Sequence, residues 1–239
     1  MREHRAVYPE TPSAPSDWAA GSGESTPAGP RTAGQPREEA RRCGEWPSLT
    51  LLGQALATYL VAGSREGIYL IDQHAAHERI LFERLAAELD KDGVSVQRLA
   101  VAQTVPVTQP EFLSWQAHKD TWRRVGFELE EFGADTLLLR AVPAALSLTA
   151  AGRLLRELLE QAPEADRDTP WERERHQLLA ALACHGAIRA GQTLTLAEGK
   201  ELITQLAQCR HPYNCPHGRP TYVCLTQREL EKRFVRVLG

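Results

Sequence analysis

The stretch from Asp72 to Glu83 holds the side-chain types best suited to binding a metal ion. It reads Asp-Gln-His-Ala-Ala-His-Glu-Arg-Ile-Leu-Phe-Glu and follows the apolar run 67–71, which indicates a helix that opens where a strand ends. With about 100° per helical residue, His74 and Glu78 lie about 40° apart and share a side with the leucines at 81, 85 and 89. A carboxylate and an imidazole facing an apolar interior are costly unless they are paired, hydrogen-bonded or bound to a cation. The sequence therefore predicts a functional site here.

Two later segments add possible ligands. One contains Cys184 and His185, and the other runs from Cys209 and His211 to Cys215-Pro-His-Gly-Arg-Pro220. In the second, a proline and a glycine stiffen and then turn the chain, so that Cys215 and His217 face one side. Thiolates, imidazoles and carboxylates suit zinc or a similar transition metal. Taken alone, Cys-x-His equally describes a buried thiol beside a surface imidazole, so its weight comes from the combination.

Several enzyme classes are disfavoured by the motifs. A zinc-protease helix needs its glutamate between the two histidines, whereas Glu78 follows both His74 and His77. The sequence has no Gly-x-Ser-x-Gly elbow, glycine-rich phosphate loop or dinucleotide fingerprint. A thiol-based redox sensor is also disfavoured, because no Cys-x-x-Cys pair is present.

Composition and charge set broad limits. The chain has 239 residues, 42% of them hydrophobic, so it can bury a sizeable core. A net charge of -3 argues against a large basic surface, and any affinity for nucleic acid must be local, weak or supplied by a partner. No apolar run approaches the roughly 18 residues of a membrane helix, so we expect a cytoplasmic protein without a membrane partner. Five cysteines without an export signal suit thiols and metal ligands better than disulfides.

The elements that must position these residues follow from periodicity, turns and caps. Residues 1–45 are rich in Pro, Ala, Gly, Ser, Thr, Arg and Glu and are expected to be a disordered linker. Strands are expected at 49–62, 67–71, 94–107 (an edge strand), 127–132, 136–142 and 220–225. Helices are expected at 74–89, 110–124, 149–161, 171–188, 196–208 and 227–237. Thr169 and Pro170 are expected to cap the helix at 171–188. This order indicates an α+β fold, a sheet-and-helix unit of 46–92 and 168–239 interrupted by a smaller α/β segment, 93–167.

Three ordered motifs carry a family resemblance. Asp72-Gln-His-Ala-Ala-His-Glu78 with Glu83, then Ala183-Cys-His-Gly-Ala-Ile-Arg-Ala-Gly191, then Cys215-Pro-His-Gly-Arg-Pro220 follow one another. In this order they resemble the C-terminal region of endonuclease-type MutL mismatch repair proteins, and residues 229–236 look like that family's last helix. The resemblance covers residues 46–239. It implies a two-lobed fold, with 46–92 and 168–239 as the dimerisation and endonuclease lobe and 93–167 as the regulatory lobe.

The resemblance also implies an activity, the metal-dependent nicking of the newly made DNA strand. It implies Zn²⁺ together with a catalytic Mn²⁺ or Mg²⁺, and catalytic roles for Asp72 and Glu78. The metal ligands carried over by motif are Asp72, His74, Glu78, Cys184, Cys215 and His217. Glu83 lies about 180° from His74 around the helix, so we expect it to support the site with Arg189 and Arg219 rather than bind metal.

Two departures from the family pattern matter. The second motif usually has a basic residue after its cysteine, whereas this chain has His185, which we expect to be a weaker positive contact rather than a ligand. The family normally begins with an ATPase domain, and no ATP site precedes Trp46. We therefore expect a C-terminal fragment, with an ATPase domain upstream or supplied in trans.

The implied partners are double-stranded DNA, MutS, a sliding clamp and a second copy of the chain, in a nucleoid-associated setting. Gln97 and Leu99 have spacing suited to a clamp-binding peptide, and an ordinary edge strand explains them equally well. Residues 51–62 offer apolar surface either to a homodimer or to the chain's own core.

A second function remains open, a non-catalytic module in which the same ligands hold a structural zinc. Structural sites are closed by protein ligands, whereas catalytic sites keep a position for water or substrate. The presence of Asp72 beside thiolate and imidazole ligands favours the enzyme.

Overall fold

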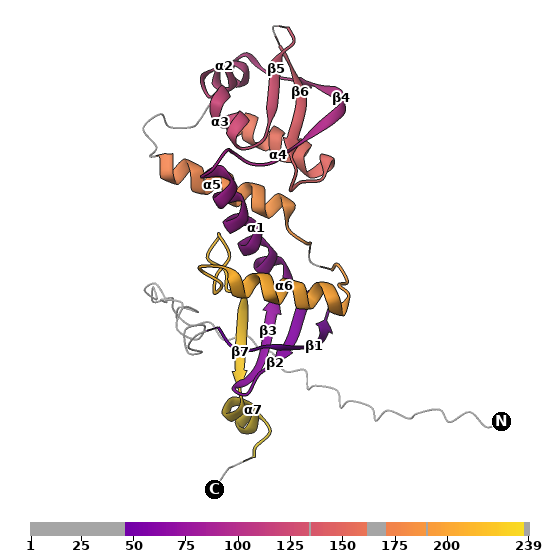
Figure 1. Cartoon of the computed structure of the whole chain (residues 1–239), viewed down its shortest axis with the longest axis vertical. Helices are drawn as coiled ribbons and strands as arrows, with labels where there is room; N and C mark the ends of the chain where they lie inside the picture. The colour runs from indigo at the N-terminus through magenta and orange to yellow at the C-terminus, as the bar shows by residue number, and fades with distance from the viewer. Residues whose placement is uncertain (1–45, 134, 162–170, 190, 237–239) are drawn as a thin grey trace, which may run out of the picture. The chain divides into compact units, whose positions relative to one another are not determined.

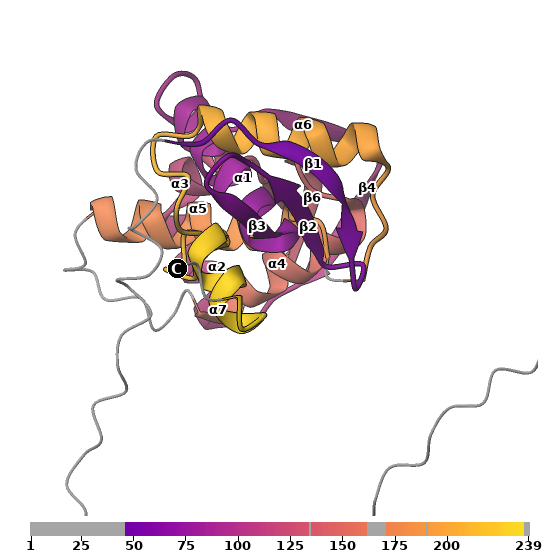
Figure 2. The ribbon, with the colours of Figure 1, turned by 90° about the horizontal axis from the view of Figure 1, so that it is seen from below.

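A four-stranded antiparallel sheet carries the strand that leads into the motif. The computed structural model describes residues 46–133, 135–161, 171–189 and 191–236. The strands β1 (Thr50–Ala55), β2 (Tyr59–Gly63), β3 (Gly67–Asp72) and β7 (Tyr222–Thr226) have the order β1-β2-β3-β7. Helix α6 (Leu196–Gln208) packs on this sheet (Figures 1 and 2), with Leu202, Ile203 and Leu206 in one core with residues of β2, β3 and β7.

The segment 49–62, expected as one strand, is instead a hairpin formed by β1 and β2. Thr58 N donates to Ala55 O at 3.1 Å, and the two central residues of this turn, Leu56 and Ala57, have φ of 53° and 47°. Two positive φ angles describe a type I′ turn, which is usually signalled by Asn-Gly. Leu-Ala gives no such signal, so the prediction of one strand was wrong for that reason.

A three-stranded antiparallel sheet forms a second centre of packing. Its order is β4 (Val96–Pro106), β6 (Thr136–Pro143) and β5 (Glu128–Glu131), which confirms β4 as an edge strand and 127–142 as a hairpin. Helices α2 (Gln109–Ala117), α3 (Lys119–Arg124) and α4 (Leu148–Gln161) accompany it, and their apolar side chains share a core with Leu137 and Leu139 of β6.

Three of the predicted helices differ from the structure by more than one residue. Residues 110–124 form two helices, α2 and α3, because His118 between them leaves the helical region with φ -121° and ψ 28°. Helix α5 (Trp171–Gly186) ends two residues early, and its expected cap at Thr169 and Pro170 lies outside the described residues. Helix α7 (Gln227–Arg233) ends four residues early, where Val235 N and Arg236 N bond back to Lys232 O and Glu231 O.

Helix α1 (Gln73–Leu89) takes part in both cores. Ala76 and Ile80 near its start belong to the core of the first sheet, and Leu85 and Leu89 near its end belong to the core of the second. Helix α1 also packs along α5. These contacts bring the motif of α1 next to the second motif.

The α+β class with two sheets is confirmed. The domain boundaries, 46–92 with 168–239 and 93–167, stay a prediction, and the expected linker 1–45 lies outside the described residues. Among the described helices, none is both long and apolar enough to cross a membrane.

Candidate metal centre

Asp72 begins helix α1. It is the last residue of β3, and its Oδ1 accepts hydrogen bonds from His74 N at 2.9 Å and Ala75 N at 3.0 Å. An aspartate at this N-cap position satisfies amide groups that have no partner inside the helix. Asp72 N in turn donates to Thr221 O at 2.9 Å. The abrupt change from strand to helix fixes where His74 and Glu78 point.

His74 is oriented by the backbone of the second motif. Its Nδ1 lies 2.8 Å from Ile188 O, and its Nε2 lies 3.1 Å from Glu78 Oε1. A carbonyl oxygen only accepts hydrogen bonds, so Nδ1 carries the hydrogen and, in the neutral ring, Nε2 presents a lone pair. That lone pair would face a carboxylate oxygen. A second proton on the ring, or a cation bound between the two groups, resolves the repulsion.

Glu78 is the centre of the cluster and has a fully buried side chain. Its Oε2 lies 3.5 Å from His217 Nδ1 and 3.3 Å from an amino nitrogen of Arg219. Burial acts to raise the pKa of Glu78, but His74, the Cys215 thiol, His217 and Arg219 together hold the pKa below its usual value. The carboxyl group is therefore charged inside the protein.

Cys184 reaches the cluster from α5. Each of His74, Glu78 and Cys184 offers one potential ligand atom, and these three atoms lie within 4.8 Å of one another. Burial and then the negative charge of Glu78 raise the pKa of Cys184. Its thiol therefore keeps its proton unless a cation takes the proton's place.

Cys215 and His217 come from a tight hairpin between α6 and β7. Gly218 N donates to Cys215 O at 2.9 Å, Cys215 N donates to Arg219 O at 2.8 Å, and Gly218 has a φ of 83°. Proline at the first turn position and glycine at the left-handed position suit this three-residue loop. Cys215 is buried and His217 is exposed, and their ligand atoms form a second group within 4.8 Å that again includes Glu78.

Helix α1 also holds this hairpin in place. The two carboxylate oxygens of Glu83 accept from Arg210 N at 2.7 Å and His211 N at 3.0 Å. Arg79 donates from Nε to Asn214 O at 2.6 Å and lies 3.7 Å from Glu83. Helix α1, which supplies His74 and Glu78, thus also fixes the position of the segment that supplies Cys215 and His217.

The remaining predicted site residues lie around the cluster or away from it. Within the described residues, neither ligand group includes Asp72. The pKa of Arg219 is raised, first by the Cys215 thiol, then by the charge of Glu78, and to a smaller extent by Asp72. Arg189 contributes a backbone carbonyl, which accepts from Gln73 Nε2 at 3.3 Å. His185 is paired with Glu157, with Nε2 to Oε2 at 3.1 Å.

Gln73 and Arg79 support the site and were not singled out from the sequence. The fully buried Gln73 donates from Nε2 to Ala57 O and Gln192 O, both at 3.0 Å, and its Oε1 accepts from Gln54 at 2.6 Å. These bonds join the start of α1 to the β1–β2 turn and to the segment after α5. Their only signal in the sequence is a long polar side chain beside the motif's apolar positions.

The residue types fit a zinc ion. Two thiols, two imidazoles and one carboxylate are the groups that bind zinc in proteins. Their atoms meet around one buried carboxylate, and a carbonyl fixes the His74 ring in the way common for metal-bound histidine. A harder ion such as Mn²⁺ or Mg²⁺ prefers oxygen ligands, which leaves Glu78 and the neighbouring Asp72 as its candidates.

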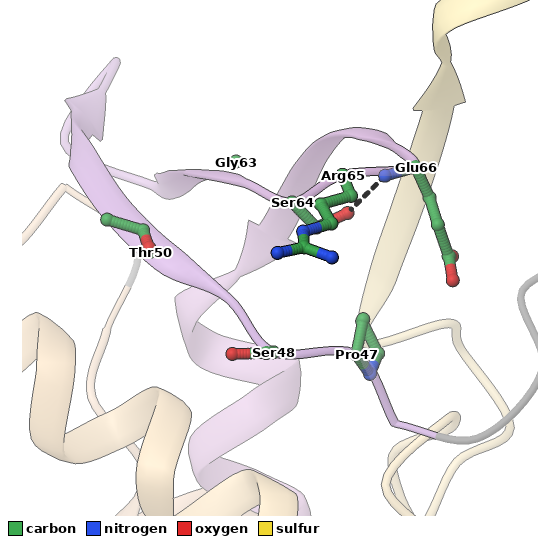
Figure 3. Close-up of a pocket in the computed structure, with 7 residues that line it drawn as sticks. All are labelled: Pro47, Ser48, Thr50, Gly63, Ser64, Arg65 and Glu66. Atoms are coloured by element: carbon green, nitrogen blue, oxygen red, sulfur yellow. Dashed lines mark hydrogen bonds between the residues drawn. The ribbon is translucent and has the colours of Figure 1, made fainter.

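A separate hollow of about 640 Å³ lies at the end of the first sheet opposite to Asp72 (Figure 3). It lies between the start of β1 and the β2–β3 turn, and Ser64 Oγ accepts from Glu66 N there at 3.0 Å. Its turn residues precede β3, whereas Asp72 ends β3, about 17 Å along the strand. The hollow therefore has no part in the cluster.

Comparisons with known proteins agree with the motifs. A family model described as the MutL C terminal dimerisation domain matches residues 52–194. A DNA mismatch repair protein MutL from Symbiobacterium thermophilum is 42% identical over 192 residues, which cover 79% of this chain and 30% of that protein. The corresponding MutL of Azotobacter vinelandii is 38% identical over 189 residues, covering 77% of this chain and 30% of its own length.

A MutL from Azorhizobium caulinodans is 38% identical over 179 residues, which cover 75% of this chain and 29% of that protein. The chain thus spans about a third of the length of the curated relatives it matches. The long family match and these identities lead to one conclusion: the chain belongs to the MutL family of DNA mismatch repair proteins, in the part that contains the C-terminal dimerisation domain.

Proposed function

We propose that this chain is a metal-dependent DNA endonuclease domain that nicks the newly made strand during mismatch repair. The observation that carries the proposal is the fully buried Glu78, around which two imidazoles and two thiols from three separate segments meet. The mismatch repair names of the relatives support the setting. A buried charge with this ligand set is much easier to explain with a cation than without one.

His74, Cys184, Cys215 and His217 would hold Zn²⁺ together with Glu78, and Asp72 and Glu78 would hold Mn²⁺ or Mg²⁺. Bound divalent ions would stabilise charge on the phosphate and lower the pKa of an attacking water. The protein's own contribution is orientation. Ile188 O fixes the His74 ring, and the Pro216–Gly218 turn fixes His217.

The open side of the cluster suits an anionic substrate. His217 and Arg219 have exposed side chains, at 43% and 59%, whereas Glu78 and Cys215 are buried beneath them. A phosphate approaching from solvent would meet the imidazole and guanidinium before the carboxylate.

The second candidate is a zinc-stabilised dimerisation and partner-binding module without catalysis. Its specific support is the N-cap made by Asp72, because this bond gives the carboxylate a structural use. Asp72 alone therefore does not separate the two functions, contrary to the argument from sequence.

The separating experiment incubates the purified chain with supercoiled plasmid and manganese, and compares Asp72→Asn and Glu78→Lys with the wild type. Asparagine caps a helix about as well as aspartate, so the first variant keeps the start of α1. The endonuclease proposal expects nicking by the wild type and a loss of about 100-fold or more in each variant. Equal nicking in all three would reject it. Zinc binding without nicking would favour the structural module.

We propose double-stranded DNA, MutS, a sliding clamp and a second copy of the chain as partners, the last supported by the family description. At the proposed clamp peptide, Gln97 Nε2 donates to Leu146 O at 2.7 Å, and Leu99 is partly buried. Clamp binding would have to compete with these contacts. Addition of clamp should raise nicking by the wild type more than by Gln97→Ala, and the exposed Gln103→Ala serves as the control. An equal rise in all three would contradict the clamp proposal.

A further inference from the structure

Arg219 is paired with Glu78 only loosely. Its amino nitrogen lies 3.3 Å and 3.5 Å from the two carboxylate oxygens, longer than the roughly 2.7–2.9 Å of a strong charge-assisted hydrogen bond. The Arg219 side chain is more than half exposed, while that of Glu78 is fully buried. Because the contacts are long and the guanidinium is exposed, another cation can take the place of Arg219 at the carboxylate.

The carboxylate that Arg219 contacts is the one group common to both ligand sets. Of the three side chains paired with Glu78, His74 and His217 can be neutral, whereas Arg219 always carries its charge. A divalent cation bound to the same carboxylate would repel the positive guanidinium, which the carboxylate otherwise attracts. Arg219 and a metal ion are therefore competitors for Glu78.

The geometry of the hairpin permits this competition without unfolding. Arg219 O accepts from Cys215 N at 2.8 Å, so the backbone beside Arg219 is fixed independently of its side chain. The long side chain emerges on the exposed side of the cluster, beside the exposed His217. A guanidinium freed there has a planar set of donors suited to a phosphate.

We propose that Arg219 neutralises Glu78 when the centre holds no metal, and that metal loading frees its guanidinium to bind a DNA phosphate. The inference rests on the proposed metal centre. Arg219 is then a substrate-binding residue whose availability depends on the metal. The metal-loaded form of the chain, which is the form able to cut DNA, then also binds DNA most tightly.

The first test measures zinc affinity of the metal-free chain by competition with a chromophoric chelator, for the wild type, Arg219→Gln and Arg140→Gln. Arg140 is the matched control, an exposed arginine paired with the exposed Glu130 at 2.9 Å in the second sheet. Removal of the competing charge should make Arg219→Gln bind zinc about 3-fold tighter or more, with Arg140→Gln unchanged. Equal or weaker zinc binding by Arg219→Gln would overturn the inference.

The second test measures binding of a DNA duplex as a function of salt, with and without zinc. Each phosphate contact adds about one to the slope of log affinity against log salt concentration. Zinc should therefore increase the slope of the wild type by about one more than that of Arg219→Gln. An equal effect of zinc on both proteins would overturn the inference.

The two proposals fail in different ways. A wild-type chain that binds no zinc in the chelator assay would reject the metal centre itself, and the role of Arg219 with it. A wild-type chain that binds zinc, beside an Arg219→Gln variant with unchanged zinc and DNA binding, would reject only the role of Arg219. Thermal unfolding of both variants close to that of the wild type would exclude misfolding as the cause of any difference.

Discussion

Two opposing effects act on the pKa of Glu78. Its burial favours the neutral acid, and the surrounding imidazoles, thiol and guanidinium favour the charged form. The pKa of Glu78 is lowered, so the partners outweigh the burial. Removing one partner would leave a buried charge less well compensated, which is why such sites are sensitive to single substitutions.

The neighbouring His77 provides a prediction on acid stability. Burial, followed by the charges of Arg84 and His74, lowers the pKa of His77 to about 4, and its Nδ1 accepts from Ile188 N at 2.9 Å. Between pH 6.5 and 4 the unfolded chain binds more protons than the folded one, so stability falls as the pH falls through this window. From pH 7 to pH 5 the contribution lost is about 2 kcal/mol of unfolding free energy.

Urea unfolding at pH 7 and pH 5, in the presence of a chelator, measures this loss. His77→Gln keeps an acceptor for Ile188 N but has no titrating group, so its stability should depend less on pH than that of the wild type. The exposed His118→Gln serves as the control and should behave as the wild type. A wild type and His77→Gln with the same pH dependence would contradict the prediction.

At the residue scale, sequence spacing was sufficient to place His74 and Glu78 on the buried side of one helix and Glu83 on another side. The contributions of Cys184 and Cys215 required the combination of motifs, since neither has a periodic partner nearby. The roles of Arg79 and Arg219 depend on the path of the 210–221 segment over α1, which no local pattern determines.

At the element scale, helix α1 carries the site and is anchored at its start by Gln73. Gln73 gives the second prediction, because its amide bonds with backbone carbonyls of two separate segments. In Gln73→Met the bonds from the side-chain amide to these carbonyls, and the bond it accepts from Gln54, are lost, so the free energy of unfolding should fall by about 2–3 kcal/mol. The exposed side chain of Gln227 bonds with Glu231 on its own helix at 2.8 Å, so Gln227→Met should change the free energy of unfolding by less than about 0.5 kcal/mol.

Chemical unfolding curves of the two methionine variants and the wild type give this comparison directly. A Gln73→Met variant no less stable than Gln227→Met would show that the buried amide does not anchor α1.

The elements themselves followed from the sequence where their local signals were strong. Thr195 with Glu198 and Thr226 with Glu229 have the capping-box spacing in the sequence, and both capping boxes form at the starts of α6 and α7. The β1–β2 hairpin escaped because Leu56 and Ala57 occupy left-handed conformations that their side chains do not favour. Bonds from Gln73 Nε2 and Gly191 N to Ala57 O support this turn, and those partners are distant in sequence.

At the scale of the whole molecule, β1 is the exposed edge of the first sheet. It carries Leu52, which is 61% exposed, and the adjoining turn carries Leu56, which is 84% exposed. Exposed apolar side chains on an edge strand suit contact with a second copy of the chain. The family's dimerisation domain covers these residues.

The third prediction concerns this edge. Leu56→Asp should shift the chain toward the monomer, because burial of a carboxylate in a dimer interface is unfavourable. Aspartate tolerates the left-handed conformation better than leucine, so the turn itself should not be strained. Light scattering after size-exclusion chromatography gives the mass, with Leu113→Asp, on α2, as the control. A Leu56→Asp variant with the mass of the wild type would place the dimer contact elsewhere.

The proposed metal centre requires that α1, α5 and the Cys215–Arg219 hairpin converge on one metal ion. Zinc-edge X-ray absorption of the zinc-loaded chain tests it most directly. We predict a mixed shell, with sulfur at about 2.3 Å and nitrogen or oxygen at about 2.0–2.2 Å, in which Cys184→Ser and Cys215→Ser each reduce the sulfur signal. A shell of nitrogen and oxygen alone, or a sulfur signal unchanged in both variants, would contradict the metal centre described here.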